Sequence, residues 1–286
     1  MNGAPAPLPA TASPALAGTT LGWLAATCLL LELDTYPKPG LVSPVDQGAH
    51  RDMDAALLGR SARTLAPFFT ALAMAGAEAA PMATLRQIGI EAERRMLAAT
   101  GGINTHRGAI FGLGLLAAAA GWRLRAASSL GLGRIVATIW GPAIASHARR
   151  PDSHGAMAHH RHGAGGARDE AAAGFPTLYG VGLPALQSGE RLSAPGSEAA
   201  RVHALMALVA VLEDTNLLHR GGKEGLAFAR NAAHRFMVAG GVGQPGWRAE
   251  AQAMHRDFTA RRLSPGGAAD LLAMTLFAHA LGETPS

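Results

Sequence analysis

The sequence feature that most constrains the fold is a stretch that is apolar on every face. Residues 109–120 read Ala-Ile-Phe-Gly-Leu-Gly-Leu-Leu-Ala-Ala-Ala-Ala and contain no charged or polar side chain. A helix of this kind is stable in a soluble protein when other helices surround it. The stretch therefore predicts a central helix and a fold built from helices packed around it.

The rest of the chain is suited to supply those surrounding helices. Ala and Leu dominate, aromatic residues make up only 5% of the sequence, and no period-two strand pattern of useful length occurs. We expect helices at 16–33, 53–77, 82–98, 131–148, 168–173, 198–212 and 267–281, and a polar loop at 187–196. The prediction is an all-α fold, a single large helical bundle at 15–286 after a disordered tail at 1–14, with Gly-rich polar loops forming the active site.

Charge and cysteine usage exclude several classes of protein. The formal net charge is +5, but the arginines are scattered without a basic run, so nucleic-acid binding is not expected. The single cysteine, Cys28, excludes an intramolecular disulfide framework and suits a reducing compartment. The apolar segment 15–31 lacks the basic start of a signal peptide, and we interpret it as a buried helix of a cytoplasmic protein without a membrane span.

A run of poor helix formers from Thr100 to Phe111 separates two predicted helices. Paired glycines allow a backbone to approach a ligand closely, and polar side chains at the start of a helix suit a phosphate or another polar ligand. The candidate binding residues of this run are Gly101, Gly102, Asn104, Thr105, His106 and Arg107.

A second polar break, the Pro-rich loop at 36–54, carries the spacing His50-x-Asp52-x-Asp54. Carboxylates clustered in this way suit a hard cation such as Mg²⁺, often shared with substrate phosphates. The alternative is that Asp52 or Asp54 caps the next helix. The same loop holds Lys38, one of only two lysines in the chain.

The remaining breaks hold further candidates. Arg168 and Glu170 suit either an internal ion pair or a phosphate clamp. Asp214 follows an apolar helix, where its charge would oppose the helix dipole, and this penalty favours a functional role. Arg220 and Lys223 offer cations in a glycine-containing segment fit for a polyphosphate. A cluster of histidines could suggest a zinc site, but it has no cysteine partners, so we interpret it as an exposed loop. Its members are His154, His159, His160 and His162.

Taken together, these motifs resemble one family, the ATP:dephospho-CoA triphosphoribosyltransferases. The resemblance rests on six blocks in order: Pro37-Lys38-Pro39-Gly40-Leu41-Val42, Gly48-Ala49-His50-Arg51-Asp52-Met53, Thr100 to Phe111, Gly166-Ala167-Arg168-Asp169-Glu170-Ala171 with Gly174-Phe175-Pro176, Asp214-Thr215-Asn216, and Ser264 to Leu272.

The resemblance implies a pentosyltransferase that uses ATP and 3′-dephospho-CoA as substrates. The 2′-hydroxyl of dephospho-CoA would attack the ribose C1 of ATP, and adenine would leave. The product is the prosthetic-group precursor for the acyl carrier protein of malonate decarboxylase or citrate lyase, passed on to a holo-acyl-carrier-protein synthase. The sequence of residues 34–43 is more similar to that of the malonate decarboxylase branch of the family than to that of the citrate lyase branch.

The resemblance and the residue chemistry together assign expected roles. Asp52, Asp54 and Asp214 are candidates for the carboxylate that acts as base and stabilises positive charge on the ribose. His106 or His50 would protonate the leaving base. Expected Mg²⁺ would bind at Asp52 and Asp54. The expected substrate contacts are Lys38, Gly101, Gly102, Asn104, Thr105, Arg107, Arg168, Glu170, Asn216, Arg220, Lys223, Ser264 and Asp270.

Two departures and two alternatives accompany this expectation. Arg107 stands where the family more often has lysine, and the 159–162 histidine run has no counterpart to which a role transfers. The alternatives are a helical Mg²⁺-dependent hydrolase of N-glycosidic bonds, similar to ADP-ribosylglycohydrolases, and a non-catalytic accessory protein that binds an acyl carrier protein. A homodimer is compatible with a large all-helical chain.

Overall fold

The computed structural model describes residues 14–146 and 166–285, and this part of the chain contains helices and no strand. The predicted all-α fold is therefore confirmed. The elements are α1 (Pro14–Leu33), α2 (Ala55–Ala77), α3 (Met82–Ala99), α4 (Arg107–Arg125), α5 (Leu132–Ile139), α6 (Gly141–Ser146), α8 (Gly166–Ala172), the π-helix η1 (Leu178–Gly182), α9 (Leu183–Leu192), α10 (Glu198–Val211), α11 (Thr215–Val238), the 3₁₀-helix η2 (Gly241–Gly243), α12 (Trp247–Ala260) and α13 (Gly266–Ala280).

Helix α4 is the central helix that its apolar sequence predicts. Every residue from Ala109 to Gly121 except Phe111 is buried. Neighbouring helices α1, α2, α3, α5, α8 and α13 all contact it. The apolar faces of α4 are thus covered on all sides, as the absence of a polar stripe requires.

Small residues set the distance between α4 and its main neighbour, α2. A Cβ added at Gly76 would lie 2.0 Å from the carbonyl oxygen of Ala118, and one added at Gly121 would lie 1.9 Å from that of Ala73. Both distances are far below van der Waals contact, so the two backbones touch directly at each glycine. This reciprocal pair of contacts leaves no room for a side chain on either helix.

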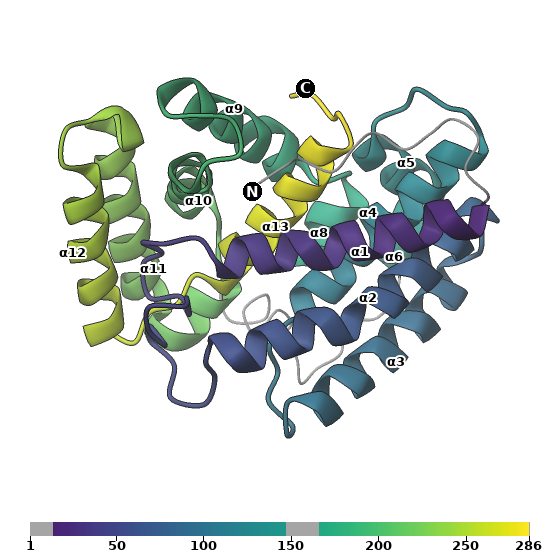
Figure 1. Cartoon of the computed structure of the whole chain (residues 1–286), viewed down its shortest axis with the longest axis horizontal. Coiled ribbons are helices and arrows are strands. Elements are labelled where there is room, and N and C mark those ends of the chain that lie inside the picture. The colour runs from purple at the N-terminus through teal and green to yellow at the C-terminus, as the bar shows by residue number, and fades with distance from the viewer. Residues whose placement is uncertain (1–13, 147–165, 286) are drawn as a thin grey trace.

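Helix α13 joins the two halves of the bundle. It contacts α1 and α4 on one side and α10, α11 and α9 on the other. Figure 1 shows α13 in yellow behind α1, with α11 and α12 at one end of the molecule and α3 at the other. The start of α13 therefore lies where the two groups of helices meet.

Helix α1 is long and apolar enough to span a membrane by length and composition, with a mean hydropathy of 1.5 over Leu16–Leu33. Half of this segment is buried inside the fold, however, against α2, α4 and α13. Cys28 on this helix is fully buried, and burial raises the pKa of its thiol to about 12. Both observations fit the predicted core helix.

Two sequence expectations differ from the structure, and two of its helices, α11 and α12, were not expected. The predicted loop at 187–196 is wrong over its first half, because α9 extends to Leu192. Pro184 lies in the first turn of this helix, and Leu183 and Leu186 bury one face while the polar residues lie outside. The predicted helix at 131–148 divides at Trp140, where Pro142 lacks the N–H that a continuous helix needs. The tail at 1–14 lies outside the described residues except for Pro14, where α1 begins.

The contact between α2 and α4 generates a stability prediction. Gly121→Ala forces a methyl group into the Ala73 carbonyl and should lower the free energy of unfolding by about 1–3 kcal/mol. Gly89→Ala on α3 is the matched control, because a Cβ there meets nothing within 4 Å. It should raise the free energy of unfolding by up to about 1 kcal/mol through helix propensity. Urea unfolding of both variants measures the difference, and equal midpoints would contradict the proposed backbone contact.

Candidate active site

A single large cavity collects most of the predicted site residues. Its volume is about 1430 Å³, and residues from α1 to α4, α6, α8, α10, α11 and α13 and from the loop at 36–54 line it. The predicted residues that the structure brings together here are His50, Asp52, Asn104, Thr105, His106, Arg107, Arg168, Glu170, Asp214, Asn216, Arg220, Ser264 and Asp270.

Three long helices begin at the wall of this cavity. Gly108 of α4, Asn216 of α11 and Gly267 of α13 all line it in the first turn of their helices. The free N–H groups and the positive dipole end of a helix attract anions. The cavity thus has a region of positive backbone potential built by segments far apart in the sequence.

Asp214 holds two of these helix starts together. One carboxylate oxygen accepts hydrogen bonds from the N–H groups of Asn216 (2.8 Å) and Leu217 (3.3 Å), and the other accepts one from Ala268 (3.0 Å). Asp214 is therefore the N-cap of α11 and also binds the first turn of α13. Its burial raises the pKa of the carboxyl, and the N–H groups lower it.

This geometry corrects the sequence argument for Asp214. We expected its charge to oppose the dipole of the preceding helix, but α10 ends at Val211 and Asp214 caps the following helix. A carboxylate at a helix N-terminus is stabilised by the dipole, so the dipole penalty that favoured a functional role does not exist.

Asp270 binds the first turn of α4, as Asp214 binds the first turns of α11 and α13. Its carboxylate packs against Gly108, where an added Cβ would lie 2.0 Å from Oδ2, and it accepts a hydrogen bond from the N–H of Ala109. Burial raises the pKa of Asp270 well above its usual value, and the neighbouring charges of Glu32 and Asp214 raise it further. The environment therefore favours the protonated form of this side chain.

His106 is buried at the start of α4. Its Nδ1 lies 2.7 Å from Ser61 Oγ, which in turn lies 2.7 Å from Thr105 Oγ1. Burial, together with the charge of Lys38, lowers the pKa of His106 to about 4. The imidazole is neutral at pH 7, so it can donate or accept a hydrogen bond but is poorly suited to the acid role that we expected.

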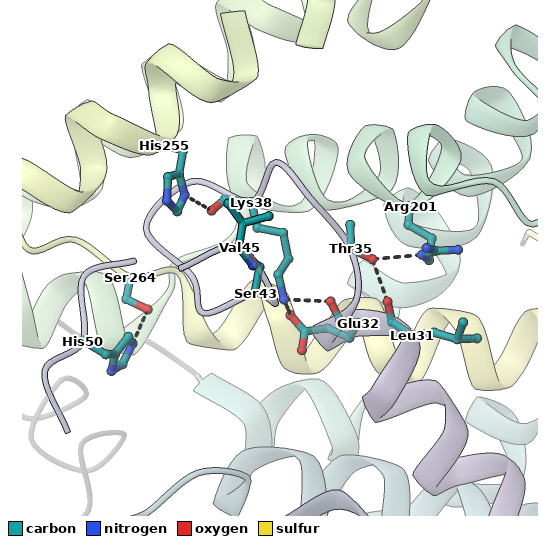
Figure 2. A network of polar contacts seen from close by, with 10 residues as sticks. All are labelled: Leu31, Glu32, Thr35, Lys38, Ser43, Val45, His50, Arg201, His255 and Ser264. Carbon is teal, nitrogen blue, oxygen red and sulfur yellow. Dashed lines mark hydrogen bonds and ion pairs between the residues drawn. The ribbon is translucent and has the colours of Figure 1, made fainter. Parts of the chain in front are cut away.

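His50 is also held neutral. The guanidinium of Arg220 lies 3.1 Å from Nδ1 and 3.4 Å from Nε2 of His50, and Nε2 lies 2.9 Å from Ser264 Oγ (Figure 2). Burial and Arg220 lower the pKa of His50, although Asp52, 3.6 Å away, opposes the shift. This network connects the loop at 36–54 to α11 and to the segment before α13.

The two metal candidates have different environments. The side chain of Asp52 lines the cavity and is 59% exposed. Asp54 lies outside the lining and accepts a hydrogen bond from the N–H of Leu57 at 2.8 Å, as the N-cap of α2. The capping alternative thus describes Asp54, while Asp52 remains available to a ligand.

The candidate residues of the Thr100-to-Phe111 run likewise divide into some that line the cavity and some that do not. Gly101 and Gly102 have φ values of 64° and 88°, are exposed, and lie outside the cavity lining. They end α3 rather than approach a ligand, since Gly102 N–H binds the Leu97 carbonyl at 2.8 Å. Asn104 accepts from the N–H of Arg107 at 3.2 Å, and the Arg107 guanidinium pairs with Glu93 at 2.5 Å.

Arg168 and Glu170 face different partners. Arg168 donates to the carbonyl of Ile144, and Glu170 accepts from the N–H (3.2 Å) and hydroxyl (2.6 Å) of Thr177. Both residues line the cavity on α8. Glu170 therefore fixes the turn after α8, in which Phe175 adopts a φ of 63°.

Neither lysine lies in the cavity wall. Lys223 follows a break in α11 at Gly222 (φ 61°, ψ −160°) and lines a smaller hollow with Arg230 and His234. Lys38 is 1% exposed and pairs with Glu32, which does line the cavity. The expectation of a direct substrate contact therefore finds no support at either position. The histidines at 154, 159, 160 and 162 lie outside the described residues.

Sequence reasoning missed several polar residues of the cavity. Glu32 was detectable, because it is the first charged residue of the chain and ends an otherwise apolar helix. Asp169 and Glu213 were also detectable, because Asp169 lies within one motif block and Glu213 directly precedes another. The others give no local signal, since their positions depend on how helices pack. They are Arg86, Glu93, Thr177 and His219.

The charge balance of the cavity is negative among the described residues. Eight lining residues carry carboxylates and four are arginines. The carboxylates are Glu32, Asp52, Glu93, Asp169, Glu170, Glu213, Asp214 and Asp270, and the arginines are Arg86, Arg107, Arg168 and Arg220. A polyanionic ligand would need further positive charge in this site.

Comparison with known proteins identifies the family of the chain. A probable 2-(5″-triphosphoribosyl)-3′-dephosphocoenzyme-A synthase from Stutzerimonas stutzeri is 41% identical over 275 residues, which cover 94% of each protein. The corresponding synthase of Klebsiella pneumoniae is 41% identical over 279 residues, or 93% of this chain and 96% of the relative. A probable synthase from Acinetobacter calcoaceticus is 38% identical over 262 residues, covering 90% and 89%. No solved structure gives a significant match.

The sequence profile of one family covers nearly the whole chain. It matches residues 18–286, which include all six motif blocks and every residue of the cavity wall. The expectation of a transferase is thereby confirmed. This chain belongs to the ATP:dephospho-CoA triphosphoribosyl transferase family.

Proposed function

We propose that this enzyme transfers the 5-triphosphoribosyl group of ATP to the 2′-hydroxyl of 3′-dephospho-CoA and releases adenine. The family supplies the reaction class, and the observation that supports it here is the cavity wall, where three helix N-termini and four arginines face carboxylates. The product would be the prosthetic-group precursor of an acyl carrier protein, made in the cytoplasm. The malonate decarboxylase branch is our preferred assignment.

The phosphates of both substrates would bind at the helix starts and the arginines. Arg168 and Arg220 already contact backbone carbonyls or a histidine, which orients their guanidinium groups at the cavity. Planar guanidinium groups can donate two parallel hydrogen bonds to a phosphate. The first turns of α4, α11 and α13 add those backbone N–H donors that Asp214 and Asp270 do not already bind.

Mg²⁺ would supply the positive charge that the wall lacks. Among the described residues, no group of three or more His, Cys, Asp or Glu side chains forms a cage for a metal ion. Mg²⁺ is commonly held by one or two carboxylates together with substrate phosphates and water, and the exposed carboxylate of Asp52 fits this arrangement. The bound ion would neutralise charge on the triphosphate.

The histidines would orient groups rather than exchange protons. His50 and His106 are both kept neutral, and each presents a hydrogen-bonding ring to the cavity. His106, with Nδ1 engaged by Ser61, would meet a substrate through Nε2. Departure of adenine leaves positive charge on the ribose, which a nearby carboxylate stabilises.

The apolar part of the cavity would hold the uncharged portions of the substrates. Leu85 and Ile90 of α3 and Phe111 and Leu115 of α4 line it, and Gly89 faces it with nothing within 4 Å of an added Cβ. Adenine and the pantetheine chain are the uncharged groups of the two substrates. An apolar wall with few polar groups is usual for such ligands.

Adenine release is the test of the proposed reaction. The protein is incubated with ATP and Mg²⁺ with and without dephospho-CoA, and free adenine is measured by chromatography. We expect release only when dephospho-CoA is present, with one triphosphoribosyl-dephospho-CoA formed for each adenine. Release without dephospho-CoA would indicate a hydrolase, and no release in either mixture would indicate a non-catalytic binding protein.

Metal removal gives a second prediction. EDTA should reduce adenine release to background, and excess Mg²⁺ should restore it. Asp52→Asn should raise the Mg²⁺ concentration for half-maximal rate by about tenfold, whereas Asp54→Asn should not, because Asn also caps helices well. Mg²⁺ titrations of the initial rate distinguish the two variants, and equal shifts would assign Asp54 to the metal as well.

The open space at Gly89 gives a third prediction. Gly89→Leu should narrow the apolar part of the cavity and raise the KM of at least one substrate about tenfold, a loss typical of a few misplaced methyl groups. Gly89→Ala is the control and should leave both KM values near those of the wild type. If Gly89→Leu changes neither KM, the substrates do not use this part of the cavity.

A further inference from the structure

Glu32 is a buried carboxylate in the wall of the cavity. It lies in the last turn of α1, its side chain is 8% exposed, and it lines the cavity. The C-terminal end of a helix is the negative end of the dipole, so a carboxylate buried there is unfavourable without a compensating cation. Such a residue therefore needs a partner.

Lys38 is that partner. Its Nζ lies 2.5 Å from Glu32 Oε1 and 2.7 Å from the main-chain carbonyl oxygen of the same residue, as Figure 2 shows. The ammonium thus neutralises both the carboxylate and the end of the helix. Burial lowers the pKa of Lys38, and the pairing with Glu32 opposes this shift.

The loop that carries Lys38 is itself fixed. The His255 ring on α12 contacts the main-chain oxygen of Lys38 through Nδ1 at 2.6 Å and contacts Asp46 through Nε2 at 2.9 Å. The main chain of Lys38 is held from α12 while its side chain reaches α1. This arrangement binds one oxygen of Glu32 to a residue that does not line the cavity.

The second carboxylate oxygen of Glu32 remains for a ligand. Among the described residues, Lys38 is the hydrogen-bond partner of this carboxylate, and it uses Oε1. The neighbouring carboxylates are differently occupied. Asp214 receives backbone N–H groups from two helices, and Asp270 is held toward its protonated form.

We propose that Glu32 is the base that accepts the proton of the attacking hydroxyl, and that Lys38 is a positioning residue that orients Glu32. This inference rests on the proposed transferase function. The O–H bond of the 2′-hydroxyl breaks as its proton passes to Glu32, and the oxygen bonds to ribose C1. The C1–N bond to adenine breaks, its electron pair leaves with the base, and the departing adenine takes one proton from water. Glu32 then returns its proton to solvent.

Glu32→Gln tests the base directly. We expect kcat for adenine release to fall about 10²–10⁴-fold while the KM values of ATP and dephospho-CoA change less than threefold. Glu91→Gln is the matched control, since Glu91 is exposed on α3 and pairs with Arg94 and Arg95 away from the cavity. It should retain wild-type kcat.

Lys38→Met tests the positioning role through a pH profile. An unpaired buried carboxylate holds its proton more tightly, so the acidic limb of the kcat–pH profile should move to higher pH, with a lower maximum. A lysine that serves only packing would leave the limb in place. Substrate KM values should again change little, because Lys38 does not line the cavity.

A double variant keeps the test decisive if Glu32→Gln unfolds. Glu32→Gln/Lys38→Met replaces the ion pair with two neutral side chains of similar size, which restores folding where an unpaired lysine was the cause. It should fold, as judged by circular dichroism and thermal unfolding, and remain inactive. An active wild type with an active Glu32→Gln or double variant would overturn the inference alone. A wild type that releases no adenine with dephospho-CoA would overturn the proposed function itself.

Discussion

The carboxylate of Asp214 is the interaction on which the active-site architecture depends. It binds the first N–H groups of α11 and of α13 at once, and α13 is the helix that contacts both halves of the bundle. The polar wall of the cavity is therefore assembled where two helix starts share one acceptor. Asp270 repeats this arrangement between α13 and α4. Two acidic side chains thus set the relative positions of three helix N-termini.

These acids also limit what the helix starts can bind. Each carboxylate occupies N–H groups that would otherwise be open to an anion, and the dipoles stabilise the carboxylates instead. Backbone N–H groups can bind an anion only where the capping carboxylates leave them free, and the arginine side chains supply the other donors. A site of this kind binds phosphate with selectivity, because negative charge is attracted at some points and repelled at others.

The sequence predicted the all-α class and the central helix, but it missed α9, α11 and α12 and was less successful with the roles of single residues. A helix that is apolar on every face, like α4, must be surrounded by other helices, so its burial could be predicted from composition alone. The polar face of α9 was mistaken for a loop because Gln187, Ser188, Glu190 and Arg191 cover an otherwise ordinary amphipathic helix. Asp214 stands between two helices, and sequence spacing does not tell which one it serves. The pairing of Lys38 with Glu32 depends on a loop that turns back onto α1, which no periodicity encodes.

The contrast between α2 and α3 has a consequence for how this enzyme family can diversify. The glycine contacts hold α2 and α4 at backbone distance, so the side chains at these contacts have no freedom to change. Helix α3, in contrast, is anchored by only three buried residues, Leu85, Ala92 and Met96, and faces the cavity through Gly89 and Ile90. Side chains on α3 could therefore change under selection for a different substrate with little effect on packing. The adaptable surface of the active site is therefore its least tightly packed helix, and directed evolution of specificity should start there.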